Sequence, residues 1–520
     1  MTERFEVVVI GSGAGGGVVA GEQARAGRDV LLLEAGPHRT AADFTRWEVH
    51  AMHDLWWPIT FARPRDGAAE GVVALIGGRC VGGSTTINTK VALRASPHEY
   101  GKWAAASRPL NDRGEPLGPA DLTPHYDRVA EVLGLRERND WLENTRMIAR
   151  GFAAVGASLE PVLSYTDENC MKCGSCLQGC PTNAGKSTQN TYISVPWAHG
   201  ELELRAECHV ERVLIDEVRG GLEAHGVAYT DARGTAHAVG ADIVVVAGGA
   251  LRTPQILLRS GVPNANVGRH LGLHPAMFVF GRFAAPQDAH RVYPITAHCL
   301  DFQRDEDGGF VVEAITVQDP IGFASSLCDE DGPLWGEPLV HAARDYRRWI
   351  GLLLMCNDDN HASVTLDDDG GEQVWTAFAP VELERRAQGV RFCREVLEAA
   401  GAERILWSLG VDHPHAGRLP DGQRPRDVGR RLPRRVPRGA PAVRRRQLGH
   451  PAHAVGQPVV HDHGARLAPG RAPRRRSPRL PPGPAGRGRV SRRVTNRPRR
   501  SASPARRARR RRTRRGRGTS

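Results

Sequence analysis

The first 36 residues carry the pattern that most constrains the fold of this 520-residue chain. Phe5–Ile10 is an apolar run, broken only by Glu6 and typical of a buried strand, and the glycine-rich string GSGAGGG follows it. The string VVAGEQARAG has the composition of a helix, and a second expected strand, Asp29–Leu33, ends on Glu34. This order of strand, loop, helix and strand predicts a βαβ unit with parallel strands. An α/β domain is therefore expected at the N-terminus.

Three glycines of the loop have separate mechanical tasks. Gly11, Gly13 and Gly16 form G-x-G-x-x-G, in which the first permits a tight turn, the second lets the backbone approach a pyrophosphate and the third lets the helix pack closely. The pyrophosphate would lie at the helix N-terminus, beside Ala14, where unpaired N–H groups favour anions. Glu34 lies 18 residues beyond Gly16, placed to accept hydrogen bonds from a ribose. The motif predicts a dinucleotide site but does not distinguish FAD from NAD.

A second glycine-rich segment, GGRCVGGSTTINTKVALR at residues 77–94, resembles a segment of the glucose–methanol–choline (GMC) oxidoreductases. In that family the segment wraps the flavin. The resemblance therefore implies that Gly82, Gly83, Ser84 and Asn88 contact FAD.

Three further stretches resemble the same family, in the same order along the chain. They are HVERVLI (His209–Ile215), DIVVVAGGALRTPQILLRSG (Asp242–Gly261) and NVGRHLGLHP (Asn266–Pro275). By resemblance Val210 would meet the adenine, Ala247 and Gly248 would line the cofactor, and a Thr-Pro pair would begin a helix, where proline's missing N–H costs nothing. The resemblance implies FAD as cofactor. It also implies a Rossmann-like FAD-binding domain, of the type shared by GMC enzymes and p-hydroxybenzoate hydroxylase, plus an α+β substrate domain.

Four cysteines are closely spaced in the middle of the chain. Cys170, Cys173, Cys176 and Cys180, followed by proline, match the C-x2-C-x2-C-x3-C-P spacing of a bacterial iron–sulfur segment. The fourth cysteine of such a run usually binds a different cluster, and the sequence has no second run. Long-chain alcohol oxidases of the GMC family are similar here, with a cysteine-rich loop before K-S-T-x-x-T-Y-[IL], matched by Lys186–Ile193. An iron–sulfur cluster, a zinc or other structural metal site and a metal-free loop all stay open.

The motifs and the composition suggest three parts. Residues 1–275 are expected to form the FAD-binding domain, including the cysteine-rich loop 165–192, with some segments of 95–165 in the substrate lobe. Residues 276–410 are expected to form the substrate-binding lobe and the start of the family's C-terminal region. Within this lobe the periodicity predicts two strands and an amphipathic helix, at Met277–Phe283, Phe310–Ile315 and Val381–Ala400.

The composition changes abruptly at about residue 417. From Arg418 to Ser520 the chain has 33 Arg, three Asp and no Lys, Glu or aromatic residue, which gives a net charge of +30. Residues 1–417 carry 38 basic and 55 acidic side chains, a net charge of −17. Residues 411–520 are expected to be a disordered, Arg- and Pro-rich tail, because this composition offers too few apolar residues for a core.

The same boundary bears on catalysis. In the GMC family a histidine shortly before an x-G-x-C-R-M-G segment takes the alcohol proton while hydride passes to the flavin. As printed, the chain lacks that segment. A shift of the reading frame by one base changes the residues that the same DNA encodes. If the bases that the amino acids leave undetermined are chosen to favour a match, the DNA of Arg418–Arg431 can encode GCRMGSDPATSVVD and that of Ala442–Gly470 can encode LFVADNSVIPRTLSVNPSFTIMALASRLA. Both strings resemble the family's ending. A frameshift from about residue 410 is therefore expected, leaving His413 as a stand-in for the catalytic histidine.

The functional expectation is an FAD-dependent alcohol oxidase or dehydrogenase that removes hydride from a CH–OH group. Its electrons would pass to oxygen or to another acceptor. Two alternatives stay open: a flavoprotein with a polycationic, nucleic-acid-binding tail, and an inactive frameshifted product. Nucleic acid is the less expected partner, because interleaved aromatic residues are missing from the tail. With no run of about 18 apolar residues and no secretory signal, no membrane span and a cytoplasmic location are expected.

Overall fold

The computed structural model places most of the first 408 residues. The described residues are 3–65, 72–106, 109–316, 320–359 and 361–408. The chain divides into two compact units, Met1–Arg438 and Gly439–Ser520, and every described residue lies in the first unit. His413 and the predicted tail at 411–520 therefore lie outside the described residues.

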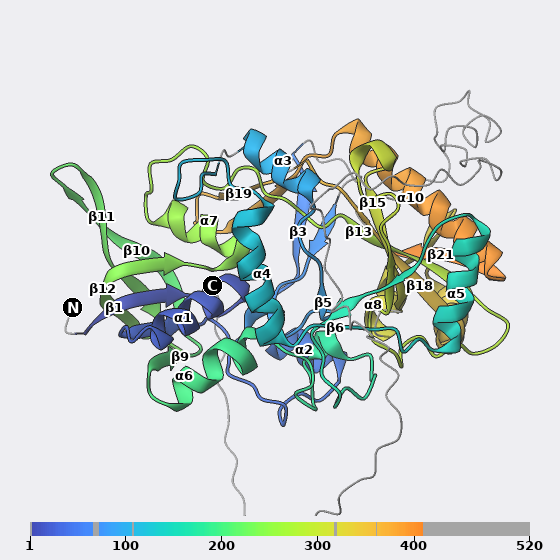
Figure 1. Cartoon of the computed structure of the whole chain (residues 1–520), viewed down its shortest axis with the longest axis horizontal. Helices are drawn as coiled ribbons and strands as arrows, with labels where there is room; N and C mark the ends of the chain where they lie inside the picture. The colour runs from blue at the N-terminus through green and yellow to red at the C-terminus, as the bar shows by residue number, and fades with distance from the viewer. Residues whose placement is uncertain (1–2, 66–71, 107–108, 317–319, 360, 409–520) are drawn as a thin grey trace, which may run out of the picture. The chain divides into compact units, whose positions relative to one another are not determined.

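A six-stranded sheet carries the N-terminal βαβ unit (Figure 1). Strands β1 and β2 pair in parallel, β12 and β9 extend the sheet in parallel on either side, and β10, β11 and β12 form an antiparallel meander. In sheet order the strands are β10 (His209–Val218), β11 (Gly221–Thr230), β12 (Ala236–Val246), β1 (Arg4–Ile10), β2 (Val30–Leu33) and β9 (Leu202–Arg205). Helix α1 (Ala14–Arg25) connects β1 to β2, so the predicted order of elements is confirmed.

From Val7 to Ile10 strand β1 is buried on both faces, which explains the unbroken apolar sequence of these four residues. Val8 and Ile10 pack into one cluster with β2 and the meander, whereas Val7 and Val9 pack into another cluster with Ala20 of α1. Successive side chains of a strand point to opposite faces, so a strand covered on both sides must be apolar at every position.

Strand β12 changes partners along its length. Residues 236–240 pair with β11, whereas residues 240–246 pair with β1. In the part of the chain that the structure describes, no strand pairs with the other edge of β12 beyond Gly240, and Ile243 is 45% exposed there. Natural proteins usually cover or pair such an edge. Residues 241–246 of β12 therefore present an unpaired edge among the described strands.

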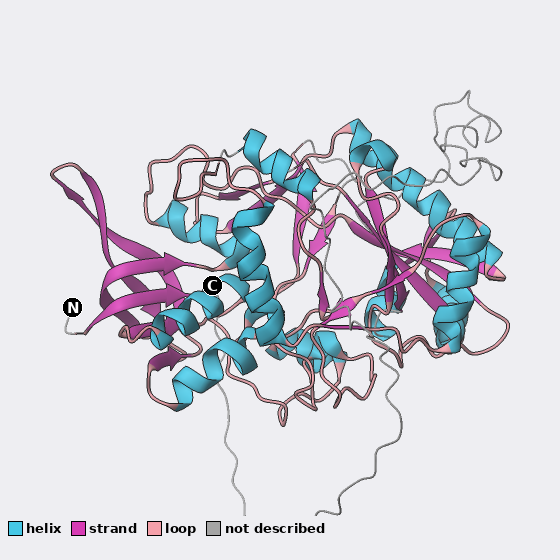
Figure 2. Ribbon diagram, viewed as in Figure 1, coloured by secondary structure: helices cyan, strands magenta, loops and turns pink. Residues whose placement is uncertain are grey.

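An eight-stranded sheet, antiparallel in every pairing, forms a second group of strands (Figure 2). In sheet order the strands are β17 (Gly332–Pro333), β16 (Leu327–Asp329), β21 (Arg404–Ser408), β13 (Ala276–Arg282), β18 (Trp349–Cys356), β15 (Phe310–Thr316), β14 (Ala297–Cys299) and β7 (Glu160–Pro161). Helices α10 (Pro380–Ala399) and α5 (Glu143–Ala154) pack on it, and the rings of Phe152 and Phe392 meet at 5.7 Å between them. The strands and helix predicted in this region are confirmed as β13, β15 and α10.

Two smaller sheets and seven further helices complete the regular structure of the described residues. The four-stranded sheet is β19 (Ser363–Leu366), β20 (Glu372–Thr376), β3 (Thr60–Pro64) and β4 (Val73–Leu75), and the three-stranded sheet is β5 (Val91–Ala92), β8 (Leu163–Ser164) and β6 (Arg136–Glu137). The helices are α2 (Glu48–Asp54), α3 (Pro97–Ala106), α4 (Pro119–Leu133), α6 (Ser194–Ala198), α7 (Gly249–Arg259), α8 (Pro320–Ser326) and α9 (Gly336–Arg344). Among the described helices none is long and apolar enough to cross a bilayer.

One predicted boundary is wrong. Helix α7 begins at Gly249 and not at the Thr-Pro pair, so Pro254 lies inside the helix. The chain enters the helix directly from the turn after β12, where Gly248 and Gly249 impose no side-chain restriction. Pro254 is therefore the sixth helical residue, where its missing N–H leaves one i→i−4 hydrogen bond unmade. Sequence alone did not show that the helix begins before the Thr-Pro pair.

Candidate functional site

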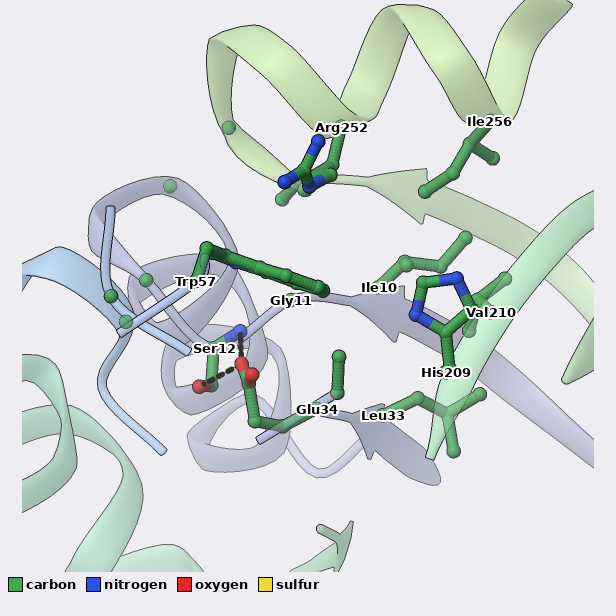
Figure 3. A pocket seen from close by; sticks show the side chains of 18 of the residues that line it. Ile10, Gly11, Ser12, Leu33, Glu34, Trp57, His209, Val210, Arg252 and Ile256 are labelled. Atoms are coloured by element: carbon green, nitrogen blue, oxygen red, sulfur yellow. Dashed lines mark hydrogen bonds between the residues drawn. The ribbon is translucent and has the colours of Figure 1, made fainter. Parts of the chain in front are cut away.

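A pocket opens where β1 and β2 end and the glycine loop turns into α1 (Figure 3). It collects residues that lie far apart in the sequence. Nine of the twelve predicted cofactor residues line it: Gly11, Gly13, Ala14, Glu34, Gly83, Ser84, Val210, Ala247 and Gly248. A pocket beyond the carboxyl ends of parallel strands is the usual ligand position in such sheets.

The glycines of the loop meet different surroundings. A Cβ on Gly11, whose φ is +92°, would lie 2.5 Å from the carbonyl oxygen of Ala247, and a Cβ on Gly16 would lie 1.9 Å from the carbonyl oxygen of Gly11. A Cβ on Gly13 would meet nothing closer than the Cα of Gly83, at 4.0 Å. The fold therefore requires glycine at the first and third positions, whereas Gly13 faces open space in the pocket.

Glu34 is fixed by the glycine loop. Its Oε2 accepts hydrogen bonds from the backbone N–H of Ser12 at 3.0 Å and from the Ser12 hydroxyl at 2.6 Å, and its Oε1 accepts from the N–H of Gly36 at 2.9 Å. Burial raises the pKa of Glu34, although these hydrogen bonds act in the opposite direction. The Ser12 hydroxyl also accepts from the N–H of Gly82 at 2.9 Å, which ties the second glycine segment to the first.

The opposite wall of the pocket is cationic and aromatic. The guanidinium groups of Arg252 and Arg79 each lie over the Trp57 ring, 4.4 Å and 5.4 Å from its centre. Figure 3 shows Trp57 between Arg252 on α7 and Ser12 in the glycine loop. Burial, reinforced by the charge of Arg259, lowers the pKa of Arg252 to about 10. The guanidinium of Arg252 is partly buried, lines the pocket and forms an ion pair with Glu372. A guanidinium group in this position suits a phosphate or another anion.

Sequence reasoning missed this wall. The missed pocket residues include those of this wall and also Ser12 of the glycine loop: Ser12, Trp57, Cys208, His209, Arg252, Gln255, Ile256 and Arg259. The four on α7 recur at i, i+3, i+4 and i+7, the spacing of a single helix face. This spacing could have identified them, but Trp57 had no comparable signal.

Three predicted cofactor residues do not line the pocket. Gly16 is buried against the loop, and Gly82 adopts a left-handed conformation with φ +94° at the start of a 3-10 turn. Asn88 donates a hydrogen bond from its side-chain amide to the hydroxyl of Tyr165. Contact of these three with a cofactor stays a prediction.

The four spaced cysteines line one small pocket of their own, together with Tyr293. All ten cysteines of the chain are free thiols. Within the described ranges, no three His, Cys, Asp or Glu side chains are grouped so as to hold a metal ion. A mononuclear zinc site would need its ligands about 2.3 Å from one point, so the metal prediction is not confirmed.

Comparisons with known proteins agree with this geometry. Residues 6–276 match the family model of the GMC oxidoreductases. The chain is 30% identical over 289 residues to long-chain-alcohol oxidase FAO4B of Arabidopsis thaliana, covering 54% of this chain and 37% of that protein. It is 31% identical over 412 residues to an uncharacterised GMC-type oxidoreductase of Mycobacterium tuberculosis, covering 78% of this chain and 62% of that protein. The aligned part thus spans less than two thirds of each of these relatives.

A solved structure of formate oxidase from Aspergillus oryzae, from a study of FAD modification, superposes with a TM-score of 0.56 at 15% identity. The superposition covers 80% of this chain and 85% of that one, which shows a shared fold. The family match covers more than half of the 520 residues, and the glycine loop, Glu34 and Val210 all lie within it. This chain belongs to the GMC oxidoreductase family.

Proposed function

We propose that the protein is an FAD-dependent oxidoreductase that oxidises the CH–OH group of an alcohol by hydride transfer to the flavin. The observation that carries the proposal is the pocket at the end of β1 and β2, where two glycine segments, an acidic residue and a cationic helix face converge. The family relation and the relatives' names support the reaction class.

The residues of the pocket fit the dinucleotide part of FAD. The open space at Gly13 and the N-terminus of α1 would receive the pyrophosphate. Glu34 would accept hydrogen bonds from a ribose, and Val210 with His209 would flank the adenine. Arg252 and Arg259 on α7 would offset the phosphate charge from the far wall. When bound, FAD supplies an acceptor for the hydride.

The second sheet supports an apolar substrate. On β18, Leu352 and Leu354 are fully buried, and Leu354 packs against Gly389 of α10. The alternate residues Leu353 and Met355 are only half-buried and point to the other face. That face carries Phe278 opposite Leu353 in the sheet register, so an apolar platform is available for an alkyl chain.

A polar pair borders this platform. Glu313 lies directly opposite Leu353 on one side and His298 on the other, so all three side chains share the face away from α10. Glu313 is only 5% exposed, and burial raises its pKa to about 7. We propose that this end of the platform meets the polar part of the substrate.

We propose that the proton acceptor of the reaction lies outside the described residues, and His413 stays a prediction. The unpaired edge of β12 supports the proposal that the C-terminal segment of the GMC family completes the FAD-binding domain. In this chain that segment can be encoded only in the shifted reading frame. We propose that this chain holds the cofactor site but lacks its catalytic segment.

A flavin titration tests the cofactor assignment. The purified protein is mixed with FAD, and the bound flavin is followed by quenching of its fluorescence and by co-elution in gel filtration. We expect one FAD per chain and no displacement by an excess of NAD. Failure to bind FAD, or displacement of FAD by NAD, would contradict the proposal.

A further inference from the structure

The loop that carries the four spaced cysteines is held in shape by packing on two sides. Gly174 and Gly179 have φ of +75° and +83°. A Cβ on Gly174 would lie 2.1 Å from the carbonyl oxygen of His290, and a Cβ on Gly179 would lie 2.4 Å from the Phe44 ring. The neighbouring elements therefore set the path of the loop, and with it the positions of the thiols.

All four thiols face the same space. Cys170, Cys173, Cys176 and Cys180 line one pocket, and Cys176 is within electrostatic range of the other three. No grouping for a single metal ion occurs in the described part of the chain. A polynuclear cluster has a different requirement, because each thiolate binds a different iron and the sulfurs stand farther apart around a shared space. Cys180, the fourth cysteine, lines the same pocket as the other three. This is needed because the chain has only one such run, so all four ligands of a cluster must come from it.

Two buried cations flank the thiols without an acidic partner. Lys90 is 1% exposed and Arg138 is 8% exposed. The Lys90 ammonium donates to the carbonyl oxygens of Thr85 and Thr86, and the Arg138 guanidinium donates to Thr166 and to the carbonyl oxygen of Asp167. Neither forms an ion pair with a described carboxylate. Asp140 is within electrostatic range of Arg138 but forms its ion pair with Lys172, and the Nε of Arg138 is buried without a partner.

These cations are close to the sulfurs. A Cβ on Gly185 would lie 3.1 Å from the Cε of Lys90 and 3.6 Å from the sulfur of Cys180. The charge of Lys90 acts on Cys176, and that of Arg138 acts on Cys170. A buried cation is costly unless a nearby negative charge offsets it. A cluster held by four thiolates is a net anion and would supply that charge.

The backbone also donates to one sulfur. The N–H of Gly185 donates to the sulfur of Cys180 at 3.2 Å, and the Thr182 hydroxyl lies 3.5 Å from the same sulfur. Hydrogen bonds to ligand sulfurs are one of the means by which proteins tune iron–sulfur potentials.

We propose that Cys170, Cys173, Cys176 and Cys180 bind an iron–sulfur cluster of the four-iron type, whose charge is offset by Lys90 and Arg138. The site lies beside the second glycine segment: Lys90 is two residues beyond Asn88, whose amide donates to Tyr165. Tyr165 in turn contacts the Lys90 ammonium, 5.6 Å from its ring centre.

The location suits single-electron transfer to a partner, an extension that rests on the proposed function. Oxidation of one alcohol to a carbonyl releases two electrons and two protons. The cluster would accept the electrons one at a time and pass each to an oxidised one-electron carrier protein, while the protons go to solvent. Once its catalytic segment is restored, the protein would then act as a dehydrogenase, with the carrier reduced twice per alcohol.

Metal analysis of protein prepared without oxygen tests the site. After expression with added iron, or reconstitution with iron and sulfide, we expect about four iron and four acid-labile sulfide per chain and an electron paramagnetic resonance signal on reduction. Cys176→Ala should lose at least half of the iron. Cys356→Ala, at a buried cysteine facing α10, should keep it. No iron in the wild type, bound zinc without sulfide, or full iron in Cys176→Ala would overturn the proposal.

A potential measurement covers the case in which Cys176→Ala does not fold. Lys90→Met removes a buried positive charge, so the cluster should become at least tenfold harder to reduce at a given potential. Lys172→Met is the matched control, because Lys172 is already paired with Asp140, and should shift that equilibrium less. Equal effects of the two variants would also overturn the proposal. FAD titration on the same samples separates the two proposals, since flavin can bind without iron and iron without flavin.

Discussion

Replacing Gly13 by alanine should separate cofactor binding from folding. Gly13 caps α1 with φ −68° and ψ −159°, which alanine can adopt without strain. A methyl group there would meet no protein atom closer than 4.0 Å. We therefore expect the free energy of unfolding of the cofactor-free protein to change by no more than about 1 kcal/mol, the usual scale of a cap substitution.

The same methyl group would occupy the space that a pyrophosphate needs. Forcing an extra methyl into a close contact typically costs about 1–3 kcal/mol, and about 1.4 kcal/mol corresponds to a factor of ten in affinity. FAD should therefore bind to Gly13→Ala about 10- to 100-fold more weakly than to the wild type.

Two neighbouring glycines provide controls. A Cβ on Gly15 would lie 3.9 Å from Ala247, so Gly15→Ala should fold normally, with a gain of up to about 1 kcal/mol from helix propensity. A Cβ on Gly16 would overlap the carbonyl oxygen of Gly11 at 1.9 Å, so Gly16→Ala should lose stability at or above the upper end of that 1–3 kcal/mol range.

The assay combines urea denaturation of the cofactor-free proteins with FAD titration by flavin fluorescence. If Gly13→Ala bound FAD within twofold of the wild type, the pyrophosphate would not lie at Gly13 and the reasoning would be refuted. A large loss of stability in Gly13→Ala would refute it equally, because the open space would then not exist.

Two further predictions concern charge. The folded pKa of Glu313, about 7 against an ordinary 4.5, means that the folded state binds more protons than the unfolded state between these values, so stability should fall as pH rises through that window. Glu313→Gln should remove this pH dependence of the free energy of unfolding. The variant should be more stable than the wild type by up to about 3 kcal/mol above pH 7 and about equally stable at pH 4. If urea unfolding shows the same pH dependence for both proteins, Glu313 does not have the raised pKa. Arg252→Met should weaken FAD binding about tenfold and reduce its dependence on salt, whereas Arg219→Met, at an exposed turn, should leave both unchanged; similar titrations for the two variants would count against a phosphate role for Arg252.

Local patterns predicted the elements that depend on local physics. The apolar run of β1, the glycine loop and Glu34 belong to one βαβ unit. Each of them could be predicted from the few residues around it. The start of α7 was misplaced because proline is favoured in the first turn of a helix, whereas Pro254 lies in the second turn of α7.

Long-range pairing could not be read in the same way. Strand β20 pairs with β3, which precedes it by about 300 residues, and no local signal marks the two as partners. The same holds for Trp57, because no local signal shows that Arg79 and Arg252 will lie over its ring. The spacing of the four cysteines could be seen in the sequence. The sequence did not show that the thiols share one pocket or that Lys90 and Arg138, which are distant in the sequence, lie beside them.

The most direct test of the central claim is the visible flavin absorption of the FAD-loaded protein, measured without oxygen as a primary alcohol is added. Two chains are compared: the chain as printed, and a chain with its reading frame restored by one base near codon 410. The account predicts that both hold FAD and that alcohol bleaches the flavin only in the restored chain. Equal bleaching in the printed chain would contradict the inferred loss of the catalytic segment, and an absence of bleaching in both would contradict alcohol oxidation itself.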